Sequence, residues 1–456
     1  MVKQEANDSA YVGHSKEHAR KRFISQGALS EISATLGSGF IVPFAKEITR
    51  NTASLVGVLS AFSGLLSPLG NLWGNKLMER YSRRTIHLRY TLLQALVFLP
   101  IIAIPFLFWN NIATTSIPLL LVIFYSLFVF FSGVKDPSSF SWLGDLVPEN
   151  ERGKYFARRN RIIGLWGLSV FLVAGIALRY FESRNLVLAS ITVLFVFSLI
   201  LRMVSYFQVK HIFSPHFKLA KSSYFSFWSF LRRYDNFGKF AMFQAVFSFS
   251  IMFASPFFSV YMLEDLHFNL LTFTIVSLSS TAFYLLFTPL AGKFSDKYGN
   301  VRLLWIAGFT FPLSPLFWLF LKNPLWLILI PNLMAGIANA ALTIGTTNFT
   351  YDAVTPQKRG LCVSYLNLLS GIGIFLGSIA GGLMINYAPL TFHGSTTLFV
   401  FAAAVVLRFA TSLIFLPQIS EARKAIKIKG LSWDVLHPFR TVRSDVVWFR
   451  KFVREK

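Results

Sequence analysis

The stretch IPLLLVIFYSLFVFFSGVKDP (117–137) carries no charge from Ile117 to Val134 and then places Lys135 beside Asp136. An apolar run of roughly 20 residues is long enough to cross a bilayer as a helix. Barrel strands would need only about 10 residues. Twelve such runs follow one another along the chain, which predicts an all-α integral membrane protein with twelve transmembrane helices. We expect the spans at 23–45, 52–74, 87–108, 116–143, 162–181, 186–208, 240–262, 270–291, 303–321, 324–350, 361–386 and 395–417.

The composition supports a membrane protein and argues against an enzyme. Of the 456 residues, 54% are hydrophobic and 14% are charged, whereas soluble domains carry about 25% charged residues. In lipid the outer surface must be apolar as well as the interior. We find no HExxH, GxSxG or P-loop motif, and the single cysteine, Cys362, excludes an internal disulfide. We therefore expect no catalytic site, no metal and no cofactor.

The net charge of +24 is unevenly placed. Basic residues gather in the segments 76–89 and 209–239 and in the tail after 417. Cytoplasmic segments of membrane proteins carry such an excess of Lys and Arg. The pattern predicts a multi-pass protein of the plasma membrane with both termini in the cytoplasm. Contact with anionic lipid headgroups explains the basic residues, so we expect no nucleic-acid partner.

Local matches recur at a similar separation in the two halves of the chain. WLGDLVPENERGKYF (142–156) matches FTYDAVTPQKRGLCV (349–363), with Asp145 and Asp352 in register. Arg202 matches Arg408 in the sixth and twelfth spans. Twelve spans therefore read as six plus six. We expect a cytoplasmic segment 1–22, a bundle 23–208, a linker 209–239 with an interfacial helix, a bundle 240–417, and a basic amphipathic tail 418–456.

A loop after the eighth span, AGKFSDKYGNVR (291–302), resembles the loop signature of the major facilitator superfamily. A first-half copy, NKLMERYSRR (75–84), follows the second span, although Asn75 and Ser82 replace the two glycines of the pattern. The resemblance covers essentially the whole chain. It implies two pseudo-symmetric six-helix bundles and a secondary transporter whose bundles rock about a central site.

The resemblance also implies a latch that holds the cytoplasmic side shut, with Glu79 and Asp296 as its acids. Glycine permits turns that other residues resist, and Asp296 could accept hydrogen bonds from amides at a helix N-terminus. Alternatively, these charges only set topology and cap helices. The expected latch residues are Glu79, Arg80, Arg84, Asp145, Arg152, Gly292, Asp296, Lys297, Gly299, Asp352 and Arg359.

Four charged residues share one level deep inside the spans of the first half: Glu31, Lys135, Asp136 and Arg202. The helical rise places them about 12 to 15 Å from the cytoplasmic rim. Their signs sum to zero, and a lone charge at such depth costs at least about 2.5 kcal/mol. The simplest neutral pairing joins Glu31 to Lys135 and Asp136 to Arg202. This network is either a structural lock or a site that responds to protons or solute.

The second half offers a polar but uncharged counterpart. Alignment of the halves places Gln244 opposite Glu31, and Thr343 opposite Asp136. With Asn339 and Thr346, these side chains suit hydrogen bonds to a solute, although a threonine can also bond its own helix. Arg408 has no evident acidic partner, and we expect it to cap backbone carbonyls; otherwise it would meet an anion or Asp352.

The leading hypothesis is a symporter-like secondary transporter that moves a small organic solute by alternating access, coupled to protons. An exporter of amphiphilic or drug-like compounds is the alternative within transport. A receptor or scaffold of the same fold, without transport, is the alternative outside it. The expected partners are a small-molecule substrate, protons and membrane lipid.

Overall fold

The computed structural model describes residues 2–49, 51–112, 114–147, 152–214, 227–232, 235–354, 356–387 and 390–422. Within these ranges, the side chains at 2–15, 152–154, 156–157, 231 and 356–360 lie outside the description. The expected tail therefore lies largely outside the described residues, as does much of the linker.

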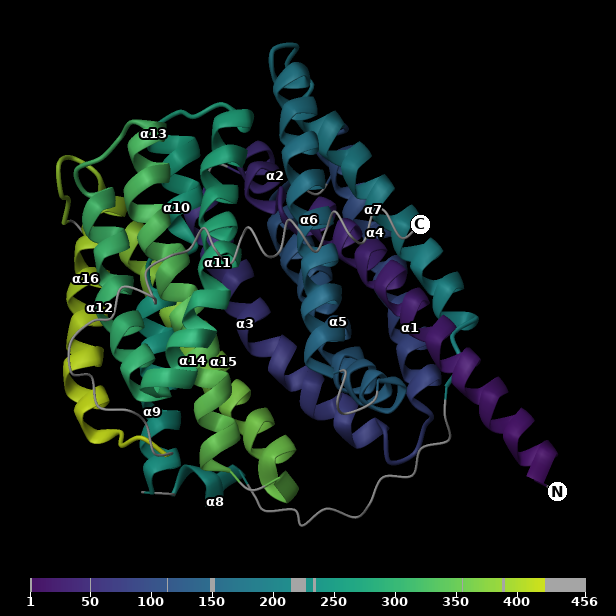
Figure 1. The fold of residues 1–456 in the computed structure, drawn as a ribbon. Helices are drawn as coiled ribbons and strands as arrows, with labels where there is room; N and C mark the ends of the chain where they lie inside the picture. The colour runs from purple at the N-terminus through teal and green to yellow at the C-terminus, as the bar shows by residue number, and fades with distance from the viewer. Residues whose placement is uncertain are drawn as a thin grey trace. The chain divides into compact units, whose positions relative to one another are not determined.

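Twelve helical segments of the described chain are long and apolar enough to cross a membrane, which confirms the expected all-α fold (Figure 1). The first span extends further than expected, because Lys16–Ile48 forms the membrane-length segment and its helix begins at Val2. The first-half helices are α1 (Val2–Ser38), α2 (Ile41–Ile48), α3 (Thr52–Leu77), α4 (Arg83–Trp109), α5 (Ile117–Leu146), α6 (Arg152–Glu182) and α7 (Val187–Lys210).

The helices of the second half are interrupted more often. Two π-helical turns, Tyr261–Asp265 and Ile328–Asn332, interrupt the seventh and tenth spans. The linker contributes one short helix, α8 (Phe227–Leu231), to the described part of the chain. The remaining helices are α9 (Asn236–Met252), α10 (Phe257–Val260), α11 (Leu270–Tyr298), α12 (Asn300–Trp318), α13 (Pro324–Leu327), α14 (Leu333–Ala353), α15 (Pro356–Tyr387) and α16 (Thr396–Phe415).

The chain packs as two compact units. The first unit comprises residues 1–222, 255–275 and 370–389, and the second comprises 223–254, 276–369 and 390–456. Two short segments of the second half therefore pack with the first half. The expected bundle limits at 208 and 240 stay a prediction.

Glycines bring α3 and α5 of the first unit into close contact. A Cβ added at Gly74 would collide with the carbonyl of Val134, and one at Gly133 would collide with the carbonyl of Ser67. Helices in membranes often approach through small residues in this way. The contact fixes the segment of α5 that immediately precedes Lys135 and Asp136.

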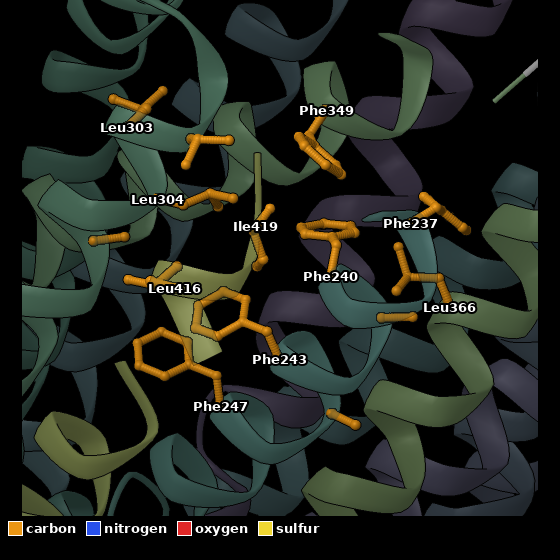
Figure 2. Packing of buried hydrophobic residues seen from close by; sticks show 14 of the residues in the cluster. Phe237, Phe240, Phe243, Phe247, Leu303, Leu304, Phe349, Leu366, Leu416 and Ile419 are labelled. Carbon is orange, nitrogen blue, oxygen red and sulfur yellow. The ribbon is translucent and has the colours of Figure 1, made fainter. Parts of the chain in front are cut away.

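Aromatic side chains fill the core of the second unit (Figure 2). The rings of Phe240 and Phe349 lie 4.5 Å apart between centroids, and those of Phe243 and Phe247 lie 5.1 Å apart. Tilted and stacked aromatic pairs at such distances are favourable beyond the area they bury. Much of the phenylalanine content therefore stabilises the helix packing.

The outer surface is apolar, as a bilayer requires. Phe106, Val173 and Val406 are each more than 60% exposed on membrane-length helices. Large apolar side chains at this exposure would be unfavourable in water but not against lipid acyl chains. The apolar surface and the lengths of the spans therefore both indicate a fold embedded in a membrane.

Candidate functional site

Lys135 is the most deeply placed lysine of the first unit, and it is held by an amide. Its side chain on α5 is buried, and Nζ donates a hydrogen bond to Oε1 of Gln94 on α4. The amide nitrogen of Gln94 donates in turn to the carbonyl of Phe128, 3.0 Å away. Both ends of the amide are therefore used, and its oxygen is fixed toward the ammonium group.

Arg202 is the second buried cation of this layer. It is 2% exposed on α7 and donates from Nη1 to the hydroxyl of Ser30 on α1. Its guanidinium carbon lies 5.5 Å from the ring centroid of Phe128, a cation–π arrangement. Its Nε is buried and finds no hydrogen-bond acceptor among the described residues. Arg202 is thus incompletely satisfied, and it can interact with a further acceptor.

The two carboxylates of the layer, Glu31 and Asp136, are exposed at their helix surfaces. The charges of Arg202 and Arg159 act on Glu31, and that of Lys135 acts on Asp136. The expected pairing of Glu31 with Lys135 and of Asp136 with Arg202 is therefore wrong. The reason is that Lys135 points toward α4, where Gln94 takes its hydrogen bond, while Arg202 points toward α1.

A histidine extends the polar layer toward the start of α4. Nδ1 of His87 lies 2.7 Å from the hydroxyl of Ser139, and Nε2 lies 3.5 Å from the amide nitrogen of Gln26. Because an amide nitrogen only donates, Nε2 must accept and Nδ1 must carry the proton. The hydroxyl of Ser139 then donates to the carbonyl of Lys135 at 3.0 Å.

The sequence analysis did not select His87, Gln94 or Arg159, because it considered only charges deep within the spans. A signal was present for the first two. Both lie in the apolar run of the third span, where polar side chains are costly and therefore informative. Arg159 precedes the expected start of the fifth span at residue 162, so it was not among the charges considered within the spans.

The polar side chains that the sequence suggested for the second unit lie on α9 and α14. Thr346 on α14 donates to Oε1 of Gln244 on α9 at 3.2 Å. Asn339 and Thr343 are exposed one turn apart on α14, and Asn339 also bonds the carbonyl of Ala335 in its own helix. This face of α14 presents amide and hydroxyl groups without any charge.

Arg408 confirms the expectation that it caps backbone carbonyls. It is 1% exposed and donates to the carbonyls of Ser250, Ile251 and Phe311 at 2.8 to 3.3 Å. Arg202 and Arg408 hold matching positions, but three carbonyls accept from Arg408, whereas the one acceptor identified for Arg202 is a serine hydroxyl. The repeat therefore conserves the arginine and changes its surroundings.

The first expected latch region is anchored by a residue outside the expected set. Arg83 begins α4, and its Nη1 lies 2.7 Å from the carboxylate of Asp145 at the end of α5. Glu79 and Arg80 are exposed in the turn after α3, and Arg84 is partly buried. The expected contact of Asp145 with Arg152 involves a side chain outside the described residues.

The second latch region has a contact like that of Arg83 with Asp145, but an asparagine takes the place of the arginine. Asn300 begins α12 and donates to the carboxylate of Asp352 on α14 at 2.7 Å. Gly299 has φ of 97°, which confirms the expected glycine turn. Lys297 is exposed beside the ring of Tyr298. The side chain of Arg359 lies outside the described residues.

One expectation for this region is wrong. Gly292 lies inside α11, where no turn is needed, and a Cβ added there would meet no atom within 4 Å. Asp296 is exposed, and its expected hydrogen bonds with amides at a helix N-terminus stay a prediction. At the start of α12, the amide of Val301 donates to Oε2 of Glu421 at 2.9 Å. A residue after the last span thus binds the helix end.

Twelve membrane-length helices that carry charged and polar side chains are typical of a membrane transporter. The family model described as Major Facilitator Superfamily matches residues 27–253 and again residues 240–453. These two matches cover most of the chain, and the chain belongs to this superfamily.

Individual relatives share the fold at low identity. A variant of the nucleoside transporter NupG superposes with a TM-score of 0.69 at 14% identity, covering 88% of this chain and 100% of that one. The D-xylose-proton symporter gives 0.65 at 16% identity, covering 91% and 99%. Vacuolar basic amino acid transporter 2 of Saccharomyces cerevisiae is 32% identical over 96 residues, which are 21% of this chain and 20% of that protein. The chain thus matches about a fifth of that relative's length.

Proposed function

We propose that this transporter moves a small organic solute by alternating access and that protons drive the movement. One observation carries the proposal. Two exposed carboxylates, Glu31 and Asp136, lie beside two buried cations, Arg202 and Lys135, in the membrane-embedded part of the first unit. Intramembrane ionisable residues are costly and most often functional.

The charge balance explains how a proton could drive a structural change. With both carboxylates ionised, the four charges sum to zero. A proton on Glu31 removes the counter-charge of Arg202, whose Nε already lacks an acceptor among the described residues. The unpaired cation is then costly at this depth. A conformation that gives Arg202 another acceptor gains stability relative to the first, which is the requirement for coupling.

The second unit supplies the groups that suit a solute. Gln244, Asn339, Thr343 and Thr346 offer amide and hydroxyl groups that can bind a polar molecule through several hydrogen bonds. A site of a few convergent polar groups on an apolar wall is typical of small-molecule binding. The D-xylose-proton symporter among the structural neighbours supports a proton-driven organic solute.

Contacts at one end of the first unit support a gate. Nζ of Lys46, near the end of α2, donates to the carbonyl of Leu263 at 2.9 Å. The amide of Leu270, at the start of α11, donates to Glu182 at the end of α6 at 3.2 Å. Both contacts join residues of the first half to the segment 255–275. In the proposed cycle these two contacts break when the site faces outward. The contacts of Asp145 and Asp352 lie at the cytoplasmic side.

The proposed topology places both termini in the cytoplasm of a cell whose plasma membrane holds the protein. The basic segments then face the leaflet rich in anionic lipid. This orientation follows from the charge distribution. The two bundles, 23–208 and 240–417, would rock against each other about a central site.

An amphiphilic cargo is the second candidate, and a groove favours it. A cavity of about 690 Å³ lies between α3 and α5 in the first unit, lined mainly by apolar side chains such as Phe62, Ile123 and Phe130. Thr49, Asn51 and Ser54 add polar groups to its lining. Such a groove suits a molecule with an apolar tail and a polar end.

Uptake into proteoliposomes tests both candidates. Purified protein is reconstituted and offered a panel of metabolites and amphiphiles, with and without an inward proton gradient. The proposal predicts that at least one polar solute accumulates several-fold above equilibrium only when the gradient is present. Accumulation that is the same with and without the gradient, or transport of amphiphiles alone, would contradict the proposal.

A further inference from the structure

Helices α1 and α6 fit together through glycines that receive side chains of the other helix. A Cβ added at Gly27 on α1 would collide with the side chain of Ile163 and lie 3.2 Å from Nη2 of Arg159, both on α6. A Cβ added at Gly167 on α6 would lie 3.2 to 3.3 Å from Cγ and Oε1 of Glu31. Each helix thus leaves room where the other places a side chain.

Arg159 and Gly167 are two helical turns apart on α6, on the face turned toward α1. Glu31 lies one turn after Gly27 on α1. Arg159 therefore approaches α1 beside Gly27, which lies one helical turn before Glu31. The start of this seam is fixed by Tyr155, whose hydroxyl donates to the carbonyl of Arg20 at 2.9 Å. Burial raises the pKa of Tyr155 to about 12, so the hydroxyl keeps the proton that it donates.

Two arginines compete for the charge of Glu31. Among the described residues, Arg202 on α7 and Arg159 on α6 are the basic groups whose charges act on it. Two further helices contact α1: α5, which carries Lys135 and Asp136, and α4, which carries His87. Nη1 of Arg159 donates to Asn160 at 3.3 Å, while its Nε is buried and finds no acceptor among the described residues. Arg159 is thus free to donate to another oxygen.

We propose that Arg159 is a positioning residue, which holds the ionised carboxylate of Glu31 over Gly167 and so makes the α1–α6 seam sensitive to the proton that Glu31 carries. The inference rests on the proposed function, because it assigns the helix that senses the proton. When Glu31 is charged, it bridges α1 to α6 through Arg159. When it is neutral, the bridge weakens, and α6 can move relative to α1.

The test has two readouts, of which one needs no substrate. Hydrophobic carbodiimides react with protonated carboxyl groups, so the extent of labelling at Glu31, measured by mass spectrometry, follows its protonation. Removing a nearby positive charge disfavours the ionised form of a carboxyl. In the Arg159→Gln variant, we expect the pH of half-labelling to rise by about one unit. Half-maximal uptake should move in the same direction.

Several variants separate positioning from folding. Arg159→Lys keeps the charge and should retain a half-labelling pH close to that of the unmodified protein. Gly167→Ala displaces the carboxylate without changing any charge, and it should raise the half-labelling pH as well. Arg161→Gln, on the same helix α6 as Arg159, is the control and should change neither readout.

The outcomes are distinguishable. An unchanged half-labelling pH in both Arg159→Gln and Gly167→Ala would overturn the inference, even if uptake falls. If the half-labelling pH shifts but uptake does not depend on the proton gradient, the inference about Arg159 stands and the proposed coupling is rejected. A drop in uptake at every pH, with an unaltered pH profile and unaltered labelling, would show that Arg159 is only structural.

Discussion

Arg83 and Asp145 form an ion pair of 2.7 Å that ties the start of α4 to the end of α5. In the second unit, Asn300 and Asp352 form the corresponding contact at 2.7 Å between the start of α12 and the end of α14. The same joint therefore exists in both halves of the repeat, charged in one and neutral in the other. A joint between the third and fourth spans of each half fixes the helix that carries the polar site residues.

The Arg83 contact predicts a modest effect on stability. Asp145→Asn removes the charge but leaves Arg83 bonded to the carbonyl and hydroxyl of Ser141. Because the carboxylate is 44% exposed, we expect a loss of about 1 kcal/mol. Thermal unfolding in detergent, followed by tryptophan fluorescence, measures it. Arg83→Met should cost more, and equal melting temperatures for all three proteins would contradict the assignment.

The bond between Lys135 and Gln94 predicts coupled mutational effects. Gln94→Leu leaves a buried ammonium without its acceptor, so we expect it to destabilise more than Lys135→Met does. The double variant should recover part of the loss, because neither polar group then remains unpaired. A double-mutant cycle of unfolding free energies measures the coupling, expected at about 1 kcal/mol. Additive effects would show that the two side chains act independently.

The two matched arginines should differ in what they do. Arg408→Met leaves three buried carbonyls without their donor, and we expect a loss of about 3 kcal/mol and a low yield of folded protein. Arg202→Lys keeps a cation beside Ser30, and we expect it to fold and to alter the dependence of uptake on the proton gradient. Melting curves and uptake assays are compared for Arg202→Lys and Arg408→Met. Normal coupling in the folded Arg202→Lys protein would contradict a role for Arg202.

The contacts of Lys46 and Glu182 predict a gate that can be loosened. In a Cys362→Ser background, a cysteine introduced at the buried position Thr274 reports access from outside. Lys46→Gln combined with Glu182→Gln should raise its labelling rate by a membrane-impermeant maleimide several-fold. Lys322→Gln, at an exposed lysine, is the matched control. An unchanged rate in the double variant would mean that these contacts do not hold the end closed.

The sequence predicted the features that depend on the lengths of the apolar runs and on the signs of the charged residues. The number of spans and the superfamily were accessible, because hydropathy and internal repeats depend on local sequence. Arg408 was also placed correctly, since a buried arginine without an acid has backbone carbonyls as its remaining acceptors.

The partner of each charge could not be predicted, because it depends on helix rotation. Lys135 and Asp136 are neighbours in sequence and point about 100° apart on a helix. Balance of charge suggested ionic partners for both, yet the rotation of α5 turns Lys135 toward the neutral Gln94. Arg159 was missed because it precedes the expected fifth span, and its influence on Glu31 depends on how α1 packs against α6.

Gradient-driven accumulation by the Glu31→Gln and Asp136→Asn proteins tests the central claim most directly. The solute identified in the panel is offered to reconstituted protein, and accumulation under a proton gradient is compared with exchange of labelled for unlabelled solute. We predict that each variant loses accumulation by at least tenfold and retains exchange within about threefold of the unmodified protein. Normal accumulation by both variants would contradict the account and show that the charged layer is structural.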